Sequence, residues 1–304
     1  MSEEQAPVDA PFRLAEILGA AAIDPIEVLD VGAMAEGRPR YDALSRQGLC
    51  RVTGFEMNSD QIPAAEAALP PGSKVLPFAL GDGGPATLHV TLYRGCSSLF
   101  EPNPDVIDMF EAISATSEGG NFRVVNRVEI GTRRLDDIAE CPLVDYAKLD
   151  IQGAELMVLE NGMEKLSQAV VIETEVEFVE VYRGQPLFGD IQTFLCSQGF
   201  VLHNRVDISG RNFLPLSTGD PTDQFPWADA VFVRDFARLE LYTVRQLLKA
   251  ATIMHDVYFS YDLANVFLYA YDFTTGSTYA EAYRDRLSQF NAAPRQFANI
   301  RDHL

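Results

Sequence analysis

Short apolar runs alternate along the chain with segments whose apolar residues recur at helical spacing. The run at residues 28–31 ends at Gly32, and the run at residues 75–80 ends at a turn rich in glycine. After Asp150, apolar side chains recur every three or four residues, as on one face of a helix. This order of strand and helix continues to Arg234 and predicts an α/β fold with a largely parallel, doubly wound sheet.

The same patterns predict further strands, followed by a closing pair. Apolar or alternating stretches suited to strands occur at residues 51–56, 87–92, 124–130, 144–149, 169–174, 200–204 and 229–233. Residues 191–197 are expected to form a helix that stops at Gly199. The glycines and prolines of residues 209–226 predict a loop over one end of the sheet.

The composition changes near Asp235. Residues 236–271 contain no glycine or proline, and their apolar spacing predicts two helices. We therefore expect one domain over residues 1–234 and a helical extension over residues 235–304. Seven aromatic residues in the extension need burial: Tyr258, Phe259, Tyr261, Phe267, Tyr269, Tyr271 and Phe273. They are expected to pack against a second copy, forming a homodimer, or against the rest of the chain.

Charge and composition argue against several partners. The net charge is −20, from 44 acidic and 24 basic residues, so neither nucleic acid nor an acidic membrane surface is an expected partner. No apolar run approaches the roughly 20 residues that a membrane helix needs. The acidic N-terminal residues do not resemble a secretory or transit signal, which favours a cytoplasmic location.

Cysteine and histidine usage gives no sign of a metal or redox centre. The four cysteines, Cys50, Cys96, Cys141 and Cys196, lie 45 to 55 residues apart and are expected to be reduced thiols. The four histidines are equally scattered, so a histidine-based metal site is not expected.

Acidic residues occur at or just beyond four predicted strand ends: Asp30, Glu56, Asp82 and Asp150. We expect these ends to share one edge of the sheet, where ligands bind in folds of this class. Glu56 lies 26 residues after Asp30, a position from which a carboxylate can accept hydrogen bonds from both hydroxyls of a ribose. The spacing from Gly32 to Gly37 does not match the dinucleotide fingerprint, which disfavours a nucleotide-binding oxidoreductase.

At these positions the sequence resembles the FkbM-type methyltransferases. The resemblance covers roughly residues 26–234, and its most specific part is the segment from Val144 to Gly162, which contains Lys148-Leu149-Asp150-Ile151-Gln152-Gly153-Ala154-Glu155. Shorter matching pieces are Leu29-Asp30-Val31-Gly32-Ala33, Gly54-Phe55-Glu56, Ala79-Leu80-Gly81-Asp82, Ser97-Ser98-Leu99-Phe100 and Arg134-Leu135-Asp136-Asp137.

The resemblance implies a seven-stranded, Rossmann-like methyltransferase sheet with S-adenosylmethionine as cofactor. It places Asp30 and Gly32 beside the methionine end, Glu56 at the ribose, Asp82 near the adenine and Asp150 near the transferring methyl group. The complete predicted cofactor set is Asp30, Gly32, Ala33, Glu56, Met57, Gly81, Asp82 and Asp150. The first loop, Met34-Ala35-Glu36-Gly37, and Asn58-Ser59 depart from the usual family pattern.

The resemblance also implies an acceptor hydroxyl on a carbohydrate or secondary metabolite, so the expected partner is a small molecule or glycan. Such a hydroxyl must lose its proton to a base or a metal. We predict Asp150 and Glu173 as the catalytic residues, with Glu155 and Glu175 as further candidates. Glu173 comes first because it is an acid in an apolar strand, although it could instead be a structural acceptor. A divalent metal is an alternative that we do not expect.

A third possibility is a catalytically silent interaction protein that keeps the sheet and assembles through its helical extension. Titration with S-adenosylmethionine and with NAD distinguishes methyltransferase from oxidoreductase, and turnover on an acceptor panel distinguishes an enzyme from the silent protein.

Overall fold

A computed structural model describes residues 10–32, 38–57, 62–216 and 224–290. These residues form two compact units. The helical unit consists of the described parts of Met1–Ile26, Gly37–Arg51 and Asp235–Leu304. The sheet unit consists of the described parts of Glu27–Glu36 and Val52–Arg234.

The elements follow one another in the order expected of an α/β protein. The strands are β1 (Ile26–Val31), β2 (Cys50–Phe55), β3 (Lys74–Leu76), β4 (Ala79–Leu80), β5 (Pro85–Thr91), β6 (Val124–Arg133), β7 (Tyr146–Leu149), β8 (Val171–Glu177), β9 (Phe200–Arg211) and β10 (Gln224–Arg234). The α-helices are α1 (Ala15–Leu18), α2 (Asp42–Ser45), α3 (Ile62–Ala68), α4 (Pro104–Ile107), α5 (Glu155–Glu160), α6 (Phe188–Ser197), α7 (Val244–Asp256), α8 (Tyr261–Thr275) and α9 (Tyr279–Ser288). Short 3₁₀ helices are η1 (Ala20–Ala22), η2 (Arg94–Cys96), η3 (Leu135–Asp137), η4 (Lys165–Gln168) and η5 (Leu239–Leu241).

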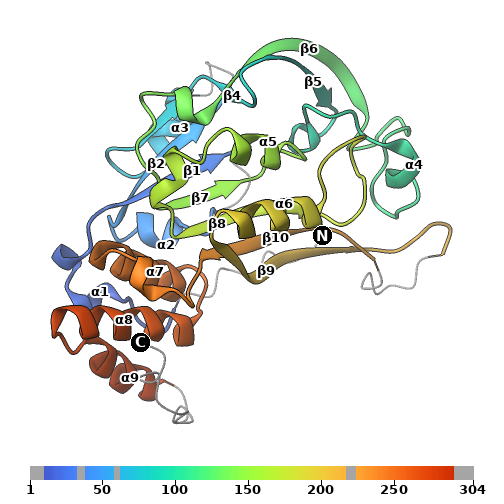
Figure 1. Cartoon of the computed structure of the whole chain (residues 1–304). Coiled ribbons are helices and arrows are strands. Elements are labelled where there is room, and N and C mark those ends of the chain that lie inside the picture. The colour runs from blue at the N-terminus through green and yellow to red at the C-terminus, as the bar shows by residue number, and fades with distance from the viewer. Residues whose placement is uncertain (1–9, 33–37, 58–61, 217–223, 291–304) are drawn as a thin grey trace. The chain divides into compact units, whose positions relative to one another are not determined.

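Seven strands form one sheet in the order β3-β2-β1-β7-β8-β10-β9 (Figure 1). β1, β7 and β8 run parallel, and β10 runs antiparallel to both of its neighbours. The chain order reverses between β1 and β7, and ligands bind outside the strand ends at such a reversal. The predicted α/β fold, with a seven-stranded methyltransferase sheet, is confirmed.

One face of this sheet is apolar and lies under α5 and α6 (Figure 1). Leu149 and Ile172 of the strands pack there with Leu159 of α5 and Leu195 of α6, and all four side chains are buried. Full burial of each such side chain contributes roughly 1.5–3 kcal/mol. α6 ends shortly before Gly199, whose positive φ of 81° fits the predicted helix stop.

The predicted third strand is wrong in one respect, because it is divided between two sheets. β3 belongs to the seven-stranded sheet, whereas β4 joins a three-stranded sheet of order β4-β6-β5. Pro77 lies between them and has no backbone N–H to continue a ladder. Asp82, which follows β4, therefore does not lie at a strand end of the main sheet.

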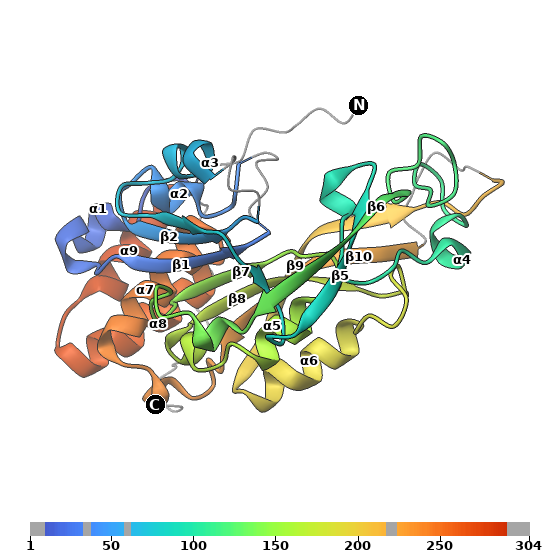
Figure 2. The same cartoon turned by 90° about the horizontal axis from the view of Figure 1, so that it is seen from above.

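The predicted loop over residues 209–226 is wrong at both of its ends, which belong to strands, and residues 217–223 lie outside the described residues. β9 extends to Arg211 and β10 begins at Gln224, and these two residues pair in the long hairpin visible in Figure 2. The register shifts between Gln224 and Trp227, which accommodates Pro226 in a strand that has neighbours on both sides. The predicted helix after Asp150 is also shorter than its apolar spacing suggests, since α5 ends at Glu160 and η4 follows.

The helical extension contains the two predicted helices, α7 and α8, and a further helix, α9. Thr243 caps α7, because its hydroxyl accepts from the Gln246 backbone N–H and the Gln246 side chain accepts from the Thr243 N–H. Such a reciprocal cap contributes about 1 kcal/mol. α8 ends at Gly276, which adopts the left-handed conformation.

Five of the seven aromatic residues of the extension are at least partly covered inside the helical unit. Phe267 is buried, four of the seven are partly covered, and Phe259 and Phe273 remain exposed. The packing of these described residues gives the predicted homodimer no support. The division at Arg234 stays a prediction, although residues 10–26 and 38–51 group with the extension. In the part of the chain that is described, no helix is long and apolar enough to cross a membrane.

Candidate active site at the carboxyl ends of the strands

Most of the residues predicted for the cofactor lie at the ends of three neighbouring strands. Asp30 is a buried residue of β1, and Gly32 follows that strand directly. Glu56 and Met57 follow β2, and Asp150 follows β7. β2, β1 and β7 are adjacent in the sheet, which brings these positions to one edge. Ala33 lies outside the described residues.

The turn after β1 closes tightly against the end of β7. Gly32 has a φ of +91°, and a Cβ placed on it would lie 1.8 Å from the carbonyl oxygen of Asp150. The Asp150 N–H also donates to the carbonyl of Val31 at 2.9 Å. Glycine is therefore required at position 32 by both conformation and space.

Gly81 and Asp82 are placed differently from the other predicted cofactor residues. Both follow β4 in the three-stranded sheet, and Asp82 is exposed. Its Oδ1 accepts from the Gly84 N–H at 2.8 Å and lies 3.4 Å from the Thr132 hydroxyl. Asp82 thus closes the turn before β5, and its contact with an adenine ring stays a prediction.

The second face of the main sheet is polar near the carboxyl ends of its strands. Lys148 of β7 is directly opposite Asp30 on one side and Glu173 on the other. Across the next pair of strands, Asp229 is opposite Glu175 and Trp227 is opposite Glu177. Paired residues project from the same face of a sheet, so these side chains form one line. We call the carboxyl groups of Asp30, Asp150, Glu173, Glu175, Glu177 and Asp229 the acidic row.

Lys148 is a cation that faces the acidic row. Its ammonium lies 3.3 Å from Oδ2 of Asp150. Burial lowers the pKa of Lys148, but the carboxylates of Asp150, Asp30, Glu173 and Asp229 outweigh burial and raise that pKa overall. Lys148 therefore stays protonated and compensates part of the negative charge.

Two of the candidate bases are occupied by structural contacts. Glu173 is 1% exposed, and its Oε2 accepts from the Tyr146 hydroxyl at 2.9 Å. Glu155 is fully buried and accepts from the N–H groups of Ile151 and Gly153 at 2.7 and 2.9 Å. Burial raises the pKa of Glu155 to about 7. Glu155 thus holds the loop that follows β7.

Glu175 is different, because it is partly exposed at the end of β8. Its Oε2 accepts from the Gln152 side-chain amide at 2.6 Å, and its other oxygen has no partner among the described residues. Burial raises the pKa of Glu175 well above its ordinary value, and repulsion from Asp150 and Glu177 adds to the rise. The raised pKa makes this carboxylate a stronger base than an ordinary glutamate, and the oxygen without a described partner is the one that could take up a proton.

Sequence reasoning did not single out Gln152, Glu177 or Asp229, and it ranked Glu175 behind Glu173. One signal was available, since residues 173, 175 and 177 are all glutamate. A spacing of two in a strand puts all three on one face.

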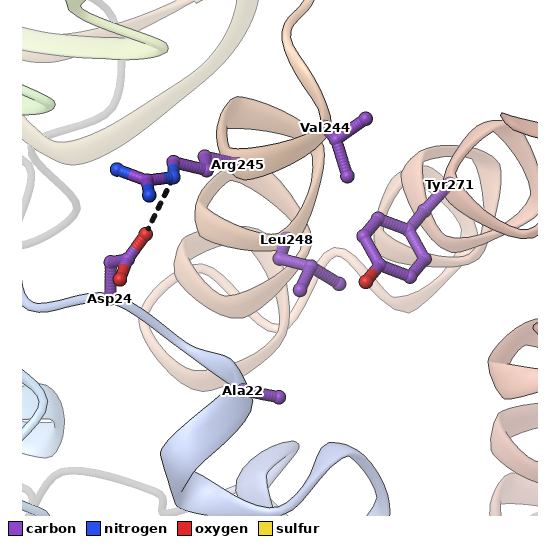
Figure 3. A pocket seen from close by; sticks show the side chains of 6 residues that line it. All are labelled: Ala22, Asp24, Val244, Arg245, Leu248 and Tyr271. Atoms are coloured by element: carbon purple, nitrogen blue, oxygen red, sulfur yellow. Dashed lines mark ion pairs between the residues drawn. The ribbon is translucent and has the colours of Figure 1, made fainter. Parts of the chain in front are cut away.

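A pocket of about 170 Å³ lies elsewhere, within the helical unit (Figure 3). Leu248 of α7 and Tyr271 of α8 point into it, and Arg245 forms an ion pair of 3.1 Å with Asp24 at its edge. It contains none of the predicted cofactor residues. Across the described residues, no group of three or more His, Cys, Asp or Glu side chains is arranged to hold a metal ion.

A family model for the methyltransferase FkbM domain matches residues 30–202, more than half of the chain. The chain belongs to the FkbM methyltransferase family. The predicted FkbM-type methyltransferase family is confirmed.

Solved structures resemble this FkbM methyltransferase only distantly. LepI in complex with S-adenosylmethionine is 12% identical with a TM-score of 0.35, and the alignment covers 77% of this chain and 50% of LepI. TrmK of M. capricolum is 11% identical with a TM-score of 0.32, covering 86% of this chain and 97% of TrmK. The 23S rRNA methyltransferase ErmE is 12% identical with a TM-score of 0.33, and the alignment covers 87% of this chain and 98% of ErmE. The chain spans about half the length of LepI. A comparison with curated proteins finds no match.

Proposed function

We propose that this FkbM methyltransferase methylates a hydroxyl group of a carbohydrate or secondary metabolite, with Glu175 as the general base. The observation that carries the proposal is the state of Glu175. It is a partly exposed carboxyl at the carboxyl end of β8, with a raised pKa and one oxygen that no described residue occupies.

The residues at the ends of β1, β2 and β7 suit the methyl donor. S-adenosylmethionine supplies a methyl group on a positively charged sulfonium. The carboxylates of Asp30 and Asp150 provide negative charge near that end, and Gly32 lets the backbone turn closely there. Glu56 is partly exposed after β2 and can accept from a ribose diol. Ala33, Met57, Gly81 and Asp82 complete the proposed cofactor set.

The chemistry of the acceptor follows from the acidic row. A hydroxyl group donates to carboxylates, and Glu175 and Asp229 are both partly exposed opposite one another on β8 and β10. The other oxygen of Glu175, which has no partner among the described residues, can accept the hydroxyl proton while the acceptor oxygen bonds to the methyl carbon and the bond from that carbon to the sulfonium sulfur breaks. A positioned base of this kind contributes roughly 10²–10⁴-fold to the rate.

The other candidates for the base, Asp150 and Glu173, stay predictions, but their contacts favour other roles. Asp150 accepts from Lys148 through one oxygen and from Gln152 through the other. Glu173 lies deeper in the sheet and accepts from Tyr146. Both can therefore stabilise charge without exchanging a proton with the acceptor.

The proposal is tested with S-adenosylmethionine and a panel of sugars, polyols and phenols, with the corresponding amines as comparison. Mass spectrometry of the products identifies methyl ethers. We expect methyl ethers from at least one hydroxylated acceptor and a strong loss in Glu175→Gln. Exclusive methylation of the amines would contradict the proposal.

Two further predictions accompany this function. The acceptor is a small molecule or glycan rather than nucleic acid, and the protein is cytoplasmic. The homodimer through the C-terminal helices also stays a prediction, which sedimentation of the full chain at micromolar concentration tests. A single monomeric species would contradict it.

A further inference from the structure

Gln152 adopts a backbone conformation that most side chains avoid. Its φ is +61°, and Gly153 follows with a φ of +100°. The left-handed region is unfavourable for residues with a Cβ, and glycine is the usual solution. The chain instead keeps a long amide side chain here, at the loop that joins β7 to α5. Unfavourable conformations of this kind concentrate at functional sites.

The side chain of Gln152 uses both ends of its amide. Its Nε2 donates to Oδ1 of Asp150 at 3.1 Å and to Oε2 of Glu175 at 2.6 Å. Its Oε1 accepts from the Tyr182 hydroxyl at 2.7 Å. Tyr182 is 1% exposed, so this anchor is rigid and shielded from water. A side-chain amide has two hydrogens to donate, and both are directed at carboxyl groups.

The main chain of Gln152 is fixed as well. Its carbonyl accepts from the Ser98 hydroxyl at 2.5 Å, and Ser98 is buried. The Tyr182 hydroxyl also lies 3.1 Å from the carbonyl of Cys96. Gln152 thus ties together three segments: the loop after β5, the end of β7 and the segment after β8.

Asp150 and Glu175 repel one another, because both are acids at neighbouring strand ends. An amide that donates to both keeps them at a fixed separation without adding charge. Donation to Oε2 of Glu175 also leaves the other oxygen of that group available. Lysine in place of Gln152 would add a positive charge that offsets one of the two carboxylates, and leucine would donate to neither.

From these contacts we propose that Gln152 is a positioning residue for methyl transfer, which orients the free oxygen of Glu175 toward the acceptor and holds it apart from Asp150. The inference rests on the proposed role of Glu175 as the base. It adds that the loop containing Cys96 and Ser98 is linked to the base through Gln152 and Tyr182, so this loop and the base share one support.

The test compares the full-length wild type with Gln152→Met, Gln152→Gly and a control, Gln198→Met. Methionine keeps the length of the side chain but cannot donate, and glycine removes the side chain while suiting the left-handed backbone. Gln198 lies just after α6, is exposed and donates to the neighbouring Ser197 hydroxyl. Its variant should behave as wild type in every measurement.

Three quantities are measured for each protein: the affinity for S-adenosylhomocysteine, the melting temperature, and the titration of Glu175 by ¹³C NMR of labelled glutamate carboxyl groups. The Glu175 signal is assigned by its absence in Glu175→Gln. We expect unchanged affinity, a melting temperature of Gln152→Gly close to wild type, and a titration of Glu175 that moves to higher pH in both Gln152 variants. Loss of a donor to a carboxylate favours the protonated form.

With an acceptor from the panel, kcat should fall about 10- to 100-fold in both Gln152 variants, as expected for loss of a hydrogen bond to a charged group. An unchanged Glu175 titration and an unchanged kcat in Gln152→Gly would overturn the inference, as would a fall in melting temperature with no change in titration. If the wild type methylates no hydroxyl on the panel, the proposed function fails. The NMR titration still decides whether Gln152 positions Glu175.

Discussion

Both units of this methyltransferase contain buried or partly buried titratable groups, but the two units differ in how many hydrogen-bond partners these groups have. In the helical unit, His255 is completely buried, with Nδ1 2.8 Å from the Tyr283 hydroxyl and Nε2 2.9 Å from the Phe12 carbonyl. Asp256 beside it accepts from the Leu14 N–H and from the side chain of Gln47. In the sheet unit, Glu175 has a protein partner at one oxygen and none among the described residues at the other.

This difference suggests that His255 and Asp256 have a structural role, whereas Glu175 is available for chemistry. The contacts of His255 and Asp256 join residues 12–14 to α7 and α9, so they hold together segments that are far apart in the sequence. Burial lowers the pKa of His255 to about 4 and raises that of Asp256 to about 6. Both groups are therefore neutral between about pH 4 and about pH 6. Glu175 is also desolvated, but it keeps an open oxygen at a strand end.

The largest expected effect is at Gly32, where the sheet unit has no room for a side chain. In Gly32→Ala the new Cβ would meet the Asp150 carbonyl at 1.8 Å, and φ would remain near +91°. We expect the free energy of unfolding to fall by about 3 kcal/mol or more and binding of S-adenosylhomocysteine to be lost. Chemical denaturation and calorimetry measure the two effects.

Gly48 in the helical unit supplies the matched control. Its φ is +67°, but a Cβ there would meet no described atom within 4 Å. Gly48→Ala should cost only about 1–2 kcal/mol and leave ligand binding intact. Equal effects of the two substitutions would show that the close contact at Gly32 has no special importance.

A second prediction concerns the pH dependence of stability in the helical cluster. His255 has a lowered pKa, so the unfolded chain takes up its proton first as the pH falls from about 6.5 to about 4. Proton uptake by the unfolded chain therefore lowers the free energy of unfolding by about 3 kcal/mol as the pH falls through this range. Asp256 has a raised pKa, so the folded chain takes up its proton first as the pH falls from about 6 to 3.8, which adds about 3 kcal/mol. The two contributions nearly cancel in the wild type.

The variant Asp256→Asn separates the contribution of His255 from that of Asp256, because asparagine resembles the protonated acid at every pH. Relative to wild type, this variant should be more stable by up to about 3 kcal/mol at pH 7, and the difference should vanish near pH 4. Denaturant unfolding at several pH values measures it. If the difference in free energy of unfolding between the variant and wild type does not change with pH, Asp256 has the same pKa in the folded and unfolded chain. Water would then reach the cluster more than its burial indicates.

A smaller effect is expected at the ribose position. Glu56 is partly exposed, so water can replace some of its interactions in Glu56→Ala. Two charge-assisted hydrogen bonds of roughly 1.5–3 kcal/mol each, less this compensation, should weaken S-adenosylmethionine binding about 10- to 100-fold. Asp82→Ala is the comparison, since Asp82 closes a turn in the other sheet. If Asp82→Ala weakens binding more than Glu56→Ala, the assignment of the ribose contact is wrong.

The periodicity of the sequence predicted most of the main sheet, because buried parallel strands are short apolar runs bounded by turns. It failed at Pro77, where one apparent run is divided between two sheets. It also failed at the two ends of residues 209–226, where Gly210 lies in β9 and Pro226 lies in β10 beside a register shift. Local composition does not show which irregularities a sheet can tolerate.

The candidate site was predicted in part. The acids that end β1, β2 and β7 were found because strand ends are visible in the pattern. The partners of Glu175 were not, since they depend on the register of β8 with β10 and on the left-handed backbone of Gln152. Glu173 looked more suitable as the general base because it is an acid among apolar neighbours in the sequence. Only the structure shows that the Tyr146 hydroxyl donates to its carboxylate.

The most direct test of this account compares Glu175→Gln with Glu173→Gln in methyl transfer to a hydroxylated acceptor. Both substitutions keep the size of the side chain, and in Glu173→Gln the new amide oxygen could still accept from the Tyr146 hydroxyl. We expect kcat to fall about 10²–10⁴-fold in Glu175→Gln. We expect a fall of under about tenfold in Glu173→Gln, and an unchanged affinity for S-adenosylhomocysteine in both variants. Full activity in Glu175→Gln, with loss of activity in Glu173→Gln, would contradict the account.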